Sequence, residues 1–371
     1  MIGAVIGTTG ELIKMAPVLL ALQERGTPAA IVVTAQQINQ LSAFLEDFGL
    51  PQPSLYLARG FRGHDLEHTW QVPGWAATVA TNSLRRRYDL AQRLDAIMVH
   101  GDTMTTVLGS LLARLLRVPA LHVEAGMRSG DWRNPFPEEL NRTIAARLVQ
   151  VHFAPGGRPV ANLRRERVKG TIVDIRQNTI RDAVDLAAAA GAPADIRTPA
   201  EPFGLVSLHR FELIEKPELF ESALQILNEH SRRQPLLFVD HSVTAAALRR
   251  HGFEHYFDDE RFIRTPRLRY FPFISLLRAS EFLVTDSGGC QEECAFLGHP
   301  ALIHRAVSEH DTGLDTCVVL SKMDLEVLRG FLSGYERYRV AAPPPEATPT
   351  QIITHELESM GLLPALEPAR A

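Results

Sequence analysis

Short apolar runs alternate with amphipathic segments along the chain, which is the pattern of a parallel β-sheet covered by helices. In the first half, buried strands are predicted at residues 2–6, 30–34, 96–100, 120–123 and 151–154. Helices are predicted at residues 11–24, 37–48, 103–116 and 137–149. Residues 59–87 have no clear period and are assigned to no element.

The same alternation returns in the second half. Strands are predicted at residues 203–208, 236–239, 262–265, 282–285 and 301–303, and helices at 217–229, 273–279 and 289–297. Two such sets predict an α/β fold with two Rossmann-like, doubly wound domains facing a central cleft. Residues 158–176 have mixed charge and few apolar runs, which places the boundary near Gly170. We therefore expect domains at 1–170 and 171–350, followed by a helix and tail at 351–371.

Composition narrows the class of protein. Of the 371 residues, 45% are hydrophobic and 22% charged, which is an ordinary globular balance. The net charge of -4 argues against a nucleic-acid partner, whose phosphates require a basic surface. The N-terminal apolar run is short and lacks a basic flank, and no run approaches the ~20 apolar residues of a membrane span. Three cysteines predict neither a disulfide framework nor a zinc site. We expect a cytoplasmic protein without metal or membrane contacts.

Acidic residues follow predicted strands at three places. Asp102 lies in Val-His-Gly-Asp-Thr, Glu124 in His-Val-Glu-Ala-Gly-Met-Arg, and Glu138 in Pro-Phe-Pro-Glu-Glu-Leu-Asn-Arg. Ligands of open parallel sheets bind outside the carboxyl ends of the strands, so these carboxylates are expected to converge and to serve as general acids and bases. The alternative is that Asp102 only caps the helix predicted from Thr103 and that Glu138 only favours a helix dipole.

A glycine-rich turn follows a strand of the second half. Thr-Asp-Ser-Gly-Gly ends with Ser287, Gly288 and Gly289 and leads into a predicted helix. Glycines allow close approach of the backbone, and a helix N-terminus offers free N–H groups, so the turn suits a diphosphate. Glu293, one turn into the helix, is placed to reach ribose hydroxyls. The alternative is an ordinary strand–helix turn.

Three further residues stand at positions that suit a ligand. Lys14 follows the first strand–helix turn, which is neither a Walker A loop nor a dinucleotide fingerprint, and is one of four lysines in the chain. It is either an anion contact or a solvated helix residue. His209 follows a predicted strand and is either a proton carrier or structural. Phe273 either stacks on a base or packs in the core.

Together these blocks resemble the non-hydrolysing UDP-N-acetylglucosamine 2-epimerases. The family motifs His-Gly-Asp-Thr, Val-Glu-Ala-Gly, Pro-Glu-Glu-x-Asn-Arg and Thr-Asp-Ser-Gly-Gly-x-Gln-Glu-Glu occur here in the family's order, and the resemblance covers roughly residues 2–305. It implies a UDP-N-acetylglucosamine substrate, no cofactor, a homodimer, and a last helix that packs on the first domain.

The resemblance also implies roles for single residues. The implied catalytic residues are Asp102, Glu124, Glu138, His209 and Lys14. Among them we expect Asp102 and Glu138 to act jointly as acid and base, Glu124 to support them, and His209 to assist the leaving diphosphate. The implied UDP contacts are Ser287, Gly288, Gly289, Glu293, Phe273, Arg142 and Arg210.

The chain departs from the family at several positions. Thr9 and Gly10 stand where the family has Arg-Pro, and Phe211 replaces an arginine in the family's His-Arg-Arg-Glu-Asn. In many bacterial members a second substrate molecule binds nearby as an activator. Gln36 matches one contact of that site, but Asn39 stands where the family has Gln or Glu. The departures concern nucleotide contacts and activation more than the reaction class.

The implied reaction has a chemical logic. The C2 hydrogen of an N-acetylhexosamine is not next to a carbonyl, but loss of UDP from C1 acidifies it. Elimination then gives a 2-acetamidoglucal, and UDP adds back after protonation on the other face. Three alternatives stay open: a hydrolysing 2-epimerase that releases N-acetylmannosamine, a glycosyltransferase of the same fold, and a catalytically weak UDP-sugar-binding protein.

Overall fold

The computed structural model describes residues 1–371 except 38–40, 67, 131–135, 191–195, 259, 309–310, 343–346 and 365–371, so Asn39 lies outside the described residues. The chain divides into two compact units. The first comprises Met1–Ala183 and Glu346–Ala371, and the second Val184–Pro345. The division falls after Ala183 rather than near Gly170, because residues 171–174 form a strand of the first sheet.

The first unit is built on a seven-stranded parallel sheet of order β3-β2-β1-β4-β5-β6-β7. Its strands are β1 (Ile2–Ile6), β2 (Ala30–Val33), β3 (Leu55–Tyr56), β4 (Ala96–His100), β5 (Ala120–Val123), β6 (Val151–Ala154) and β7 (Thr171–Asp174). Its helices are α1 (Thr9–Glu24), α2 (Leu41–Asp47), η1 (Thr69–Gln71), α3 (Val72–Arg93), α4 (Met104–Leu116), α5 (Glu138–Leu148), α6 (Gly157–Arg165) and α14 (Pro349–Ser359). The strand order reverses between β1 and β4, which makes their carboxyl ends the expected ligand position.

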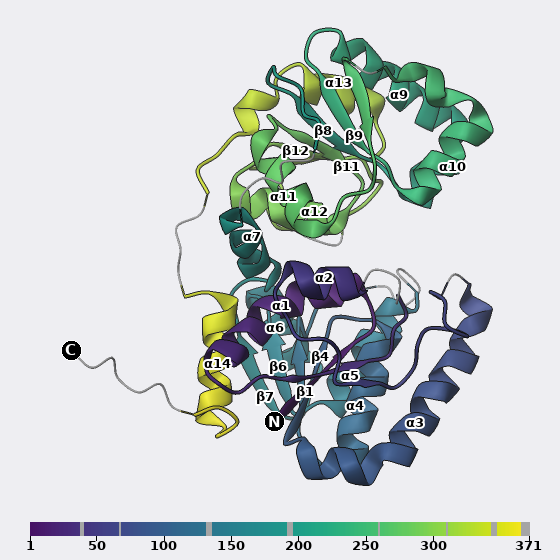
Figure 1. The fold of residues 1–371 in the computed structure, drawn as a ribbon. Helices are drawn as coiled ribbons and strands as arrows, with labels where there is room; N and C mark the ends of the chain where they lie inside the picture. Colours follow the sequence, from purple (N-terminus) through teal and green to yellow (C-terminus); the bar gives the residue numbers. More distant parts are fainter. Residues whose placement is uncertain are drawn as a thin grey trace. The chain divides into compact units, whose positions relative to one another are not determined.

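The second unit repeats this architecture around a six-stranded parallel sheet of order β10-β9-β8-β11-β12-β13. Its strands are β8 (Gly204–Ser207), β9 (Leu236–Val239), β10 (Phe262–Thr265), β11 (Leu283–Thr285), β12 (Ala301–Ile303) and β13 (Val318–Leu320). Its helices are α8 (Phe211–Ile214), α9 (Pro217–Ser231), α10 (Ser242–His251), η2 (Phe253–Tyr256), α11 (Tyr270–Ala279), α12 (Gly288–Leu297), α13 (Leu325–Leu332) and η3 (Tyr335–Tyr338), while α7 (Ile180–Ala189) crosses the division between the units. Here the strand order reverses between β8 and β11. The predicted α/β class with two doubly wound domains is confirmed (Figure 1).

Continuous apolar strands explain why both sheets are buried on both faces. Every residue of β1, β4 and β9 is buried. In the first unit, Trp75 of α3 is 1% exposed and its indole N–H donates to the Thr34 carbonyl (2.8 Å). In the second, the core contains Phe238 of β9 and Phe282 just before β11. These cores hold the strand ends, and therefore the turns that follow them, in place.

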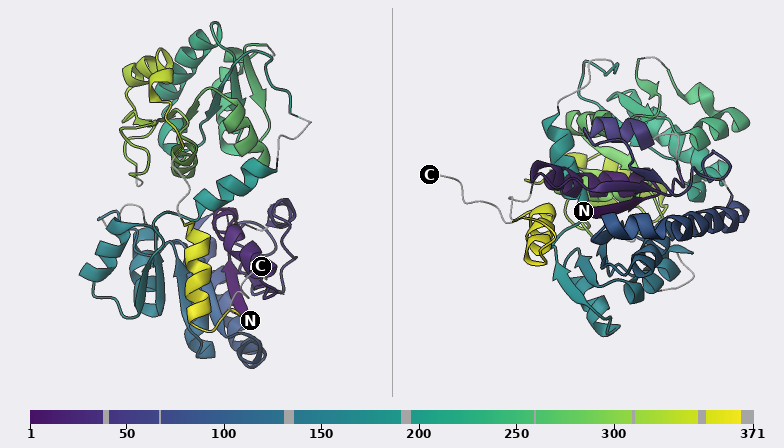
Figure 2. Two further views of the ribbon diagram at one scale, coloured as in Figure 1. Left: turned by 90° about the vertical axis from the view of Figure 1, so that its left-hand side faces the viewer. Right: turned by 60° about the horizontal axis from the view of Figure 1, so that its bottom comes forward.

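The C-terminal helix α14 packs against α1 in the first unit (Figures 1 and 2). Arg25, at the end of α1, forms an ion pair with Glu358 (3.0 Å). The Thr350 N–H donates to Asp182 Oδ2 (2.8 Å), and Thr348 caps the helix through a capping box. Among the described residues, no helix is long and apolar enough to cross a membrane.

Candidate active site

Two turns of the first unit meet where the strand order reverses. Gly7 follows β1, and a Cβ there would lie 2.0 Å from Thr105 Oγ1, so only glycine permits this approach. Thr8 then caps α1 and forms a capping box with Glu11. The turn after β1 is therefore packed tightly against the start of α4.

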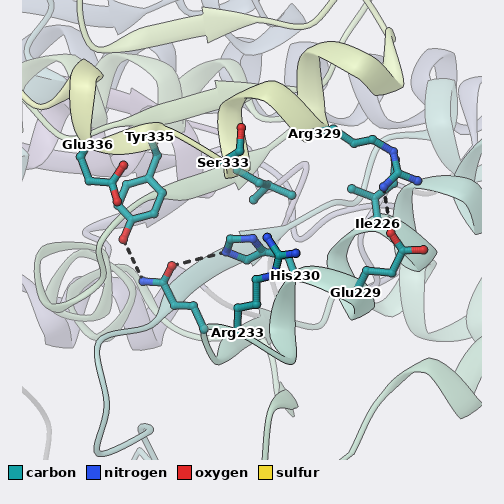
Figure 3. Close-up of a pocket in the computed structure, with 10 residues that line it drawn as sticks. Ile226, Glu229, His230, Arg233, Arg329, Ser333, Tyr335 and Glu336 are labelled. Carbon is teal, nitrogen blue, oxygen red and sulfur yellow. Dashed lines mark hydrogen bonds and ion pairs between the residues drawn. The ribbon is translucent and has the colours of Figure 1, made fainter.

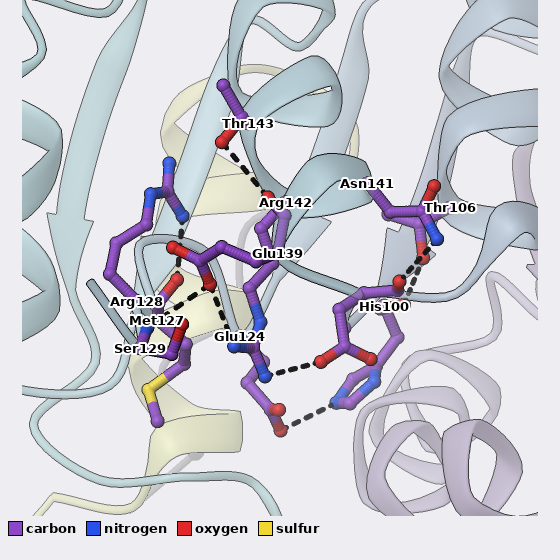
Figure 4. Close-up of polar contacts among 12 residues, drawn as sticks. His100, Thr106, Glu124, Met127, Arg128, Ser129, Glu139, Asn141, Arg142 and Thr143 are labelled. Atoms are coloured by element: carbon purple, nitrogen blue, oxygen red, sulfur yellow. Dashed lines mark hydrogen bonds and ion pairs between the residues drawn. The ribbon is translucent and has the colours of Figure 1, made fainter. Parts of the chain in front are cut away.

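Glu124 lies at the centre of a polar cluster in the first unit. It follows β5 in a left-handed conformation (φ 67°). Its Oε2 accepts hydrogen bonds from Lys14 Nζ and Asn178 Nδ2, both at 2.5 Å. His100 Nε2 lies 3.4 Å from the same oxygen (Figure 4). One buried carboxylate thus joins α1, β4 and the segment before α7.

The electrostatics of this cluster favour a charged Glu124. Burial by itself would raise the pKa of Glu124, but the Lys14 ammonium, His100 and the hydrogen bonds from Lys14 and Asn178 lower it below the ordinary value. Burial lowers the pKa of His100 to about 4, an effect that Glu124 only partly offsets. At neutral pH, Glu124 is therefore ionised and His100 is neutral.

Asp102 belongs to a second set of charges at the same sheet edge. Its Oδ2 accepts from Arg142 Nη2 (2.5 Å), and its backbone carbonyl accepts from Asn141 Nδ2 (2.9 Å). The idea that Asp102 caps the following helix is wrong, because the N-cap of α4 is Thr103, whose hydroxyl accepts from the Thr105 N–H (3.0 Å). Asp102 is thus tied to α5, not to the helix that follows it.

Arg142 bridges two carboxylates. Its Nη1 donates to Glu139 Oε2 (3.1 Å; Figure 4). Its Nη2 donates to Asp102 Oδ2. Burial raises the pKa of Asp102, and the Arg142 guanidinium offsets only part of this rise. Asp102 is therefore the more easily protonated carboxyl here, in contrast to Glu124.

Glu138 and Glu139 begin α5 but have different surroundings. Glu139 is 5% exposed and accepts from the Ser129 N–H (3.1 Å) as well as from Arg142. Glu138 is half-buried, and its Oε2 is a buried atom with no hydrogen-bond partner among the described residues. Of the two, Glu139 has a structural role in the described network, and the catalytic role of Glu138 stays a prediction.

The second unit gathers its polar groups at the ends of β8 and β11. Asp286, 1% exposed, accepts from the backbone N–H groups of His209 and Arg210 at 2.8 Å each. His209 Nδ1 lies 3.2 Å from Asp286 Oδ1. The ring of His209 stacks on that of His241, with centroids 4.2 Å apart. Asp286 thus sets the orientation of the β8–α8 turn and of His209.

Burial and nearby cations keep these histidines neutral. Burial, with Arg210 and Arg267, lowers the pKa of His209 to about 4. Burial likewise lowers the pKa of His241 to about 3, and raises that of Asp286 to about 6. At neutral pH, His209 is a neutral hydrogen-bonding ring beside two arginines.

The glycine-rich turn forms the N-terminus of α12. Ser287 is the N-cap, and its hydroxyl accepts from the Cys290 N–H (3.5 Å). The helix begins with Gly288 and Gly289, and a Cβ at Gly289 would meet only Ser287 Oγ, at 3.9 Å. The first N–H groups of a helix have no intrahelical acceptor, so this open turn suits an anion.

Glu293 lies on α12, and Phe273 lies on α11. Glu293 is 5% exposed and interacts with the Tyr270 hydroxyl and the Cys290 thiol, whose pKa values are raised by burial and by this carboxylate. Phe273 is half-buried. Both remain predicted nucleotide contacts.

Each unit brings its own predicted residues together. The first unit groups Lys14, Glu124, Asp102 and Arg142, and the second groups the β8–α8 turn with the start of α12. Sequence reasoning missed several partners of these residues: His100, Glu139, Asn178, His241, Arg267 and Asp286. His100 and Asp286 lie inside the sequence motifs, so the motifs could have indicated them. Asn178 is 54 positions from Glu124, and no motif marks it.

A hollow of about 430 Å³ in the second unit contains none of these residues. It lies between the end of α9 and the segment from α13 to η3, and is lined by Glu229, His230, Arg233, Arg329 and Tyr335 among others (Figure 3). The end of α9 leads into the start of β9, so the hollow faces the amino ends of the strands. No group of three or more His, Cys, Asp or Glu side chains in the described ranges could hold a metal ion.

Two doubly wound units, one with a carboxylate cluster and one with a glycine-rich helix start, define a two-domain α/β protein equipped for an anionic ligand. The family model for UDP-N-acetylglucosamine 2-epimerase matches residues 20–326. The UDP-N-acetylglucosamine 2-epimerase of Bacillus subtilis is 31% identical over 318 residues, covering 84% of this chain and 80% of the relative. That of Escherichia coli K12 is 31% identical over 322 residues, covering 82% of each.

Among solved structures, S. aureus MnaA in a co-structure with UDP matches with a TM-score of 0.78 and 26% identity, covering 100% of this chain and 99% of that one. The chain belongs to the UDP-N-acetylglucosamine 2-epimerase family, as the sequence motifs indicated.

Proposed function

We propose that this protein is a non-hydrolysing UDP-N-acetylglucosamine 2-epimerase, which interconverts UDP-N-acetylglucosamine and UDP-N-acetylmannosamine. Within the family, the observation that carries the proposal is the pair of carboxyl groups at one sheet edge, Asp102 and Glu124. Burial raises the pKa of Asp102, whereas Lys14 and its neighbours overcome burial and keep that of Glu124 low. A carboxyl with a raised pKa beside one that stays ionised is typical of acid/base sites, and here we assign proton transfer to Asp102 and the holding of Lys14 to Glu124.

The proposed reaction needs no outside oxidant or reductant. In the first step the C1–O bond to UDP breaks, a base takes the C2 proton, and a C1=C2 double bond forms in a 2-acetamidoglucal. In the second step an acid protonates C2 on the opposite face, and a diphosphate oxygen of UDP bonds to C1 again. Two proton-handling groups are therefore required, which we assign jointly to Asp102 and Glu138.

Other residues of the first unit hold Asp102 and Lys14 in place. Ionised Glu124 holds Lys14, so the ammonium stays at the carboxyl end of β5. Arg142 holds Asp102 through one nitrogen and Glu139 through another. In this arrangement Arg142 orients an acid/base residue, in addition to the UDP contact that the resemblance implies. Such fixed positioning is a large part of catalysis.

We assign UDP binding to the second unit. The diphosphate would bind the N–H groups at Ser287–Gly289, with Arg210 and Arg267 supplying positive charge nearby. His209, neutral at pH 7 and backed by Asp286, would donate a hydrogen bond to the leaving diphosphate. Glu293 would bind the ribose, and Phe273 would stack on uracil. The bound UDP named for S. aureus MnaA supports a nucleotide site in this fold.

The proposal is tested by incubating the protein with UDP-N-acetylglucosamine in deuterated water and recording NMR spectra over time. We expect deuterium at C2 and formation of the UDP-linked 2-epimer, with activity unchanged after dialysis against a chelator. Release of free N-acetylmannosamine with UDP would instead show the hydrolysing reaction. A failure to exchange the C2 hydrogen, with UDP-sugar still bound, would refute epimerisation altogether.

We also propose that the protein is a homodimer that associates through the first unit. α4 packs against both α3 and α5, and each of these helices exposes large apolar side chains. Tyr88 of α3 is 70% exposed, Leu111 of α4 46%, and Leu140 of α5 41%, with Leu84 and Ile144 one turn away from Tyr88 and Leu140. Exposed apolar residues on neighbouring helices are typical of a protein interface.

A further inference from the structure

Glu11 is the third residue of α1, and one of its oxygens completes a local helix cap. Oε2 accepts from the N–H groups of Gly7 (2.6 Å) and Thr8 (3.0 Å), while the Glu11 N–H donates to the Thr8 hydroxyl (3.2 Å). This is a capping box, in which glutamine serves as well as glutamate. The cap therefore accounts for the two hydrogen bonds of Oε2, and it does not require the negative charge of Glu11.

The other oxygen of Glu11 makes a contact far away in the sequence. Oε1 accepts from Thr103 Oγ1 (2.5 Å). Thr103 is the N-cap of α4 and directly follows Asp102. The carboxylate thus joins the turn after β1 to the turn after β4, the two strands between which the strand order reverses.

The same helix also reaches the other carboxylate of the site. Lys14, one turn after Glu11, binds Glu124 at 2.5 Å. We propose that Glu11 is a positioning residue for the epimerase reaction, which holds the turn of Asp102 at a fixed distance from Lys14 and Glu124. The inference rests on the proposed function.

The burial of Glu11 supports a role beyond capping. Its side chain is almost fully buried, and a buried carboxylate is costly unless hydrogen bonds compensate for lost water. Burial raises the pKa of Glu11 to about 7, with Asp102 adding to the rise and the bonds from Thr103, Gly7 and Thr8 opposing it. Asp102 is the charged group that faces Glu11 from the β4–α4 turn, and Lys14 lies one turn along its own helix.

Ionisation therefore changes how firmly the two turns are joined. Ionised Glu11 offers both oxygens as acceptors to three donors, whereas the protonated carboxyl gives up one acceptor position. As the pH rises through about 7, Glu11 becomes ionised, and the link to Thr103 strengthens. Positioning of Asp102 should improve over the same range.

The decisive variant is Glu11→Gln. The amide oxygen keeps the bonds to Gly7 and Thr8, but the amide nitrogen faces Thr103 and reverses that hydrogen bond. We expect kcat at pH 8 to fall roughly 10-fold or more, because small displacements of reacting groups cost up to about 100-fold. KM should change less than about twofold, and the thermal midpoint should not fall. The rise of kcat with pH near 7 should flatten in the variant.

Control variants separate positioning from folding. Glu24→Gln makes the same substitution at an exposed position of α1 and should leave kcat unchanged. Thr103→Ala breaks the link from the other side and should lower kcat to a similar extent, while Thr103→Ser should restore it. Unchanged kcat in Glu11→Gln, or a loss of kcat matched by a loss of thermal stability, would overturn the proposal.

The link between Glu11 and Thr103 can be tested even if the proposed function is wrong. A wild-type protein that does not exchange the C2 hydrogen refutes the epimerase reaction but leaves the link between the turns open to test. Amide hydrogen exchange at residues 102–105 then reports on it directly. Faster exchange there in Glu11→Gln than in the wild type supports the link, and equal exchange overturns it.

Discussion

Replacing Asp102 with asparagine tests whether its carboxyl has a catalytic role or only a structural one. Asparagine has nearly the same shape and keeps an oxygen for Arg142, but it cannot take up a proton at neutral pH. In the wild type, Asp102 Oδ2 bonds Arg142 Nη2 at 2.5 Å, and Arg142 also holds Glu139. The substitution therefore weakens one contact of a buried guanidinium while leaving its other partner.

The expected loss of stability is small. The bond to the Arg142 guanidinium keeps one charged partner instead of two, which weakens it by about 1 kcal/mol. This figure is an upper value, because the Asp102 side chain is 24% exposed and its burial already raises its pKa, so removing its charge brings some relief. For a domain of this size, about 1 kcal/mol lowers the thermal midpoint by roughly 2–4 °C.

The expected loss of turnover is larger. General acid/base catalysis contributes about 100-fold or more, which corresponds to roughly 2.7 kcal/mol of the barrier. Because Asp102 contacts the sugar and not the nucleotide in the proposed mechanism, UDP affinity should change little. Asp102→Asn should therefore lower turnover strongly while it lowers the thermal midpoint only slightly.

The assay measures turnover by NMR, UDP affinity by calorimetry and the thermal midpoint on the same preparations. Glu139→Gln is the matched control, because Glu139 holds the same arginine from a more buried position but carries no proton in the proposed mechanism. It should shift the midpoint by a comparable amount and lower turnover less than about 10-fold. Near-normal turnover in Asp102→Asn, or an equal loss in Glu139→Gln, would refute the assignment of Asp102.

Three further predictions concern the nucleotide, pH and assembly. Ser287→Ala should weaken UDP binding by roughly 1–2 kcal/mol, between the contribution of an ordinary hydrogen bond and that of one to a charged group, and unchanged affinity in both Ser287→Ala and Glu293→Gln would argue against this site. Lowering the pH from 7 to 5 should lower the thermal midpoint, because burial keeps the pKa values of His100 and His122 near 4 and 3 whereas the unfolded histidines take up protons near pH 6.5. A midpoint that rises as the pH falls would mean that buried carboxyls with raised pKa values dominate. Ile144→Glu should convert a dimer into a folded monomer in light scattering, and a wild type that is monomeric would exclude the proposed interface.

The sequence by itself determined most of the strands and the class of fold. The structure has β1, β4, β5 and β6 at the predicted residues, because a strand buried on both faces requires a continuous apolar run. Elements without such a run were missed. Helix α3 fills most of the unassigned stretch from 59 to 87, and β7, an edge strand with no fully buried residue, lies in the segment taken as a linker.

Tertiary structure alone decided the environment of each site residue. The motifs placed Asp102 and Glu124 at strand ends, but the partners that separate their pKa values lie 40 positions away at Arg142 and 110 positions away at Lys14. Thr103, rather than Asp102, caps α4, although both types of residue are good caps. Local patterns report which face of an element is buried. The ionisation of a carboxyl depends on desolvation and on charges that only the folded chain brings within a few ångströms.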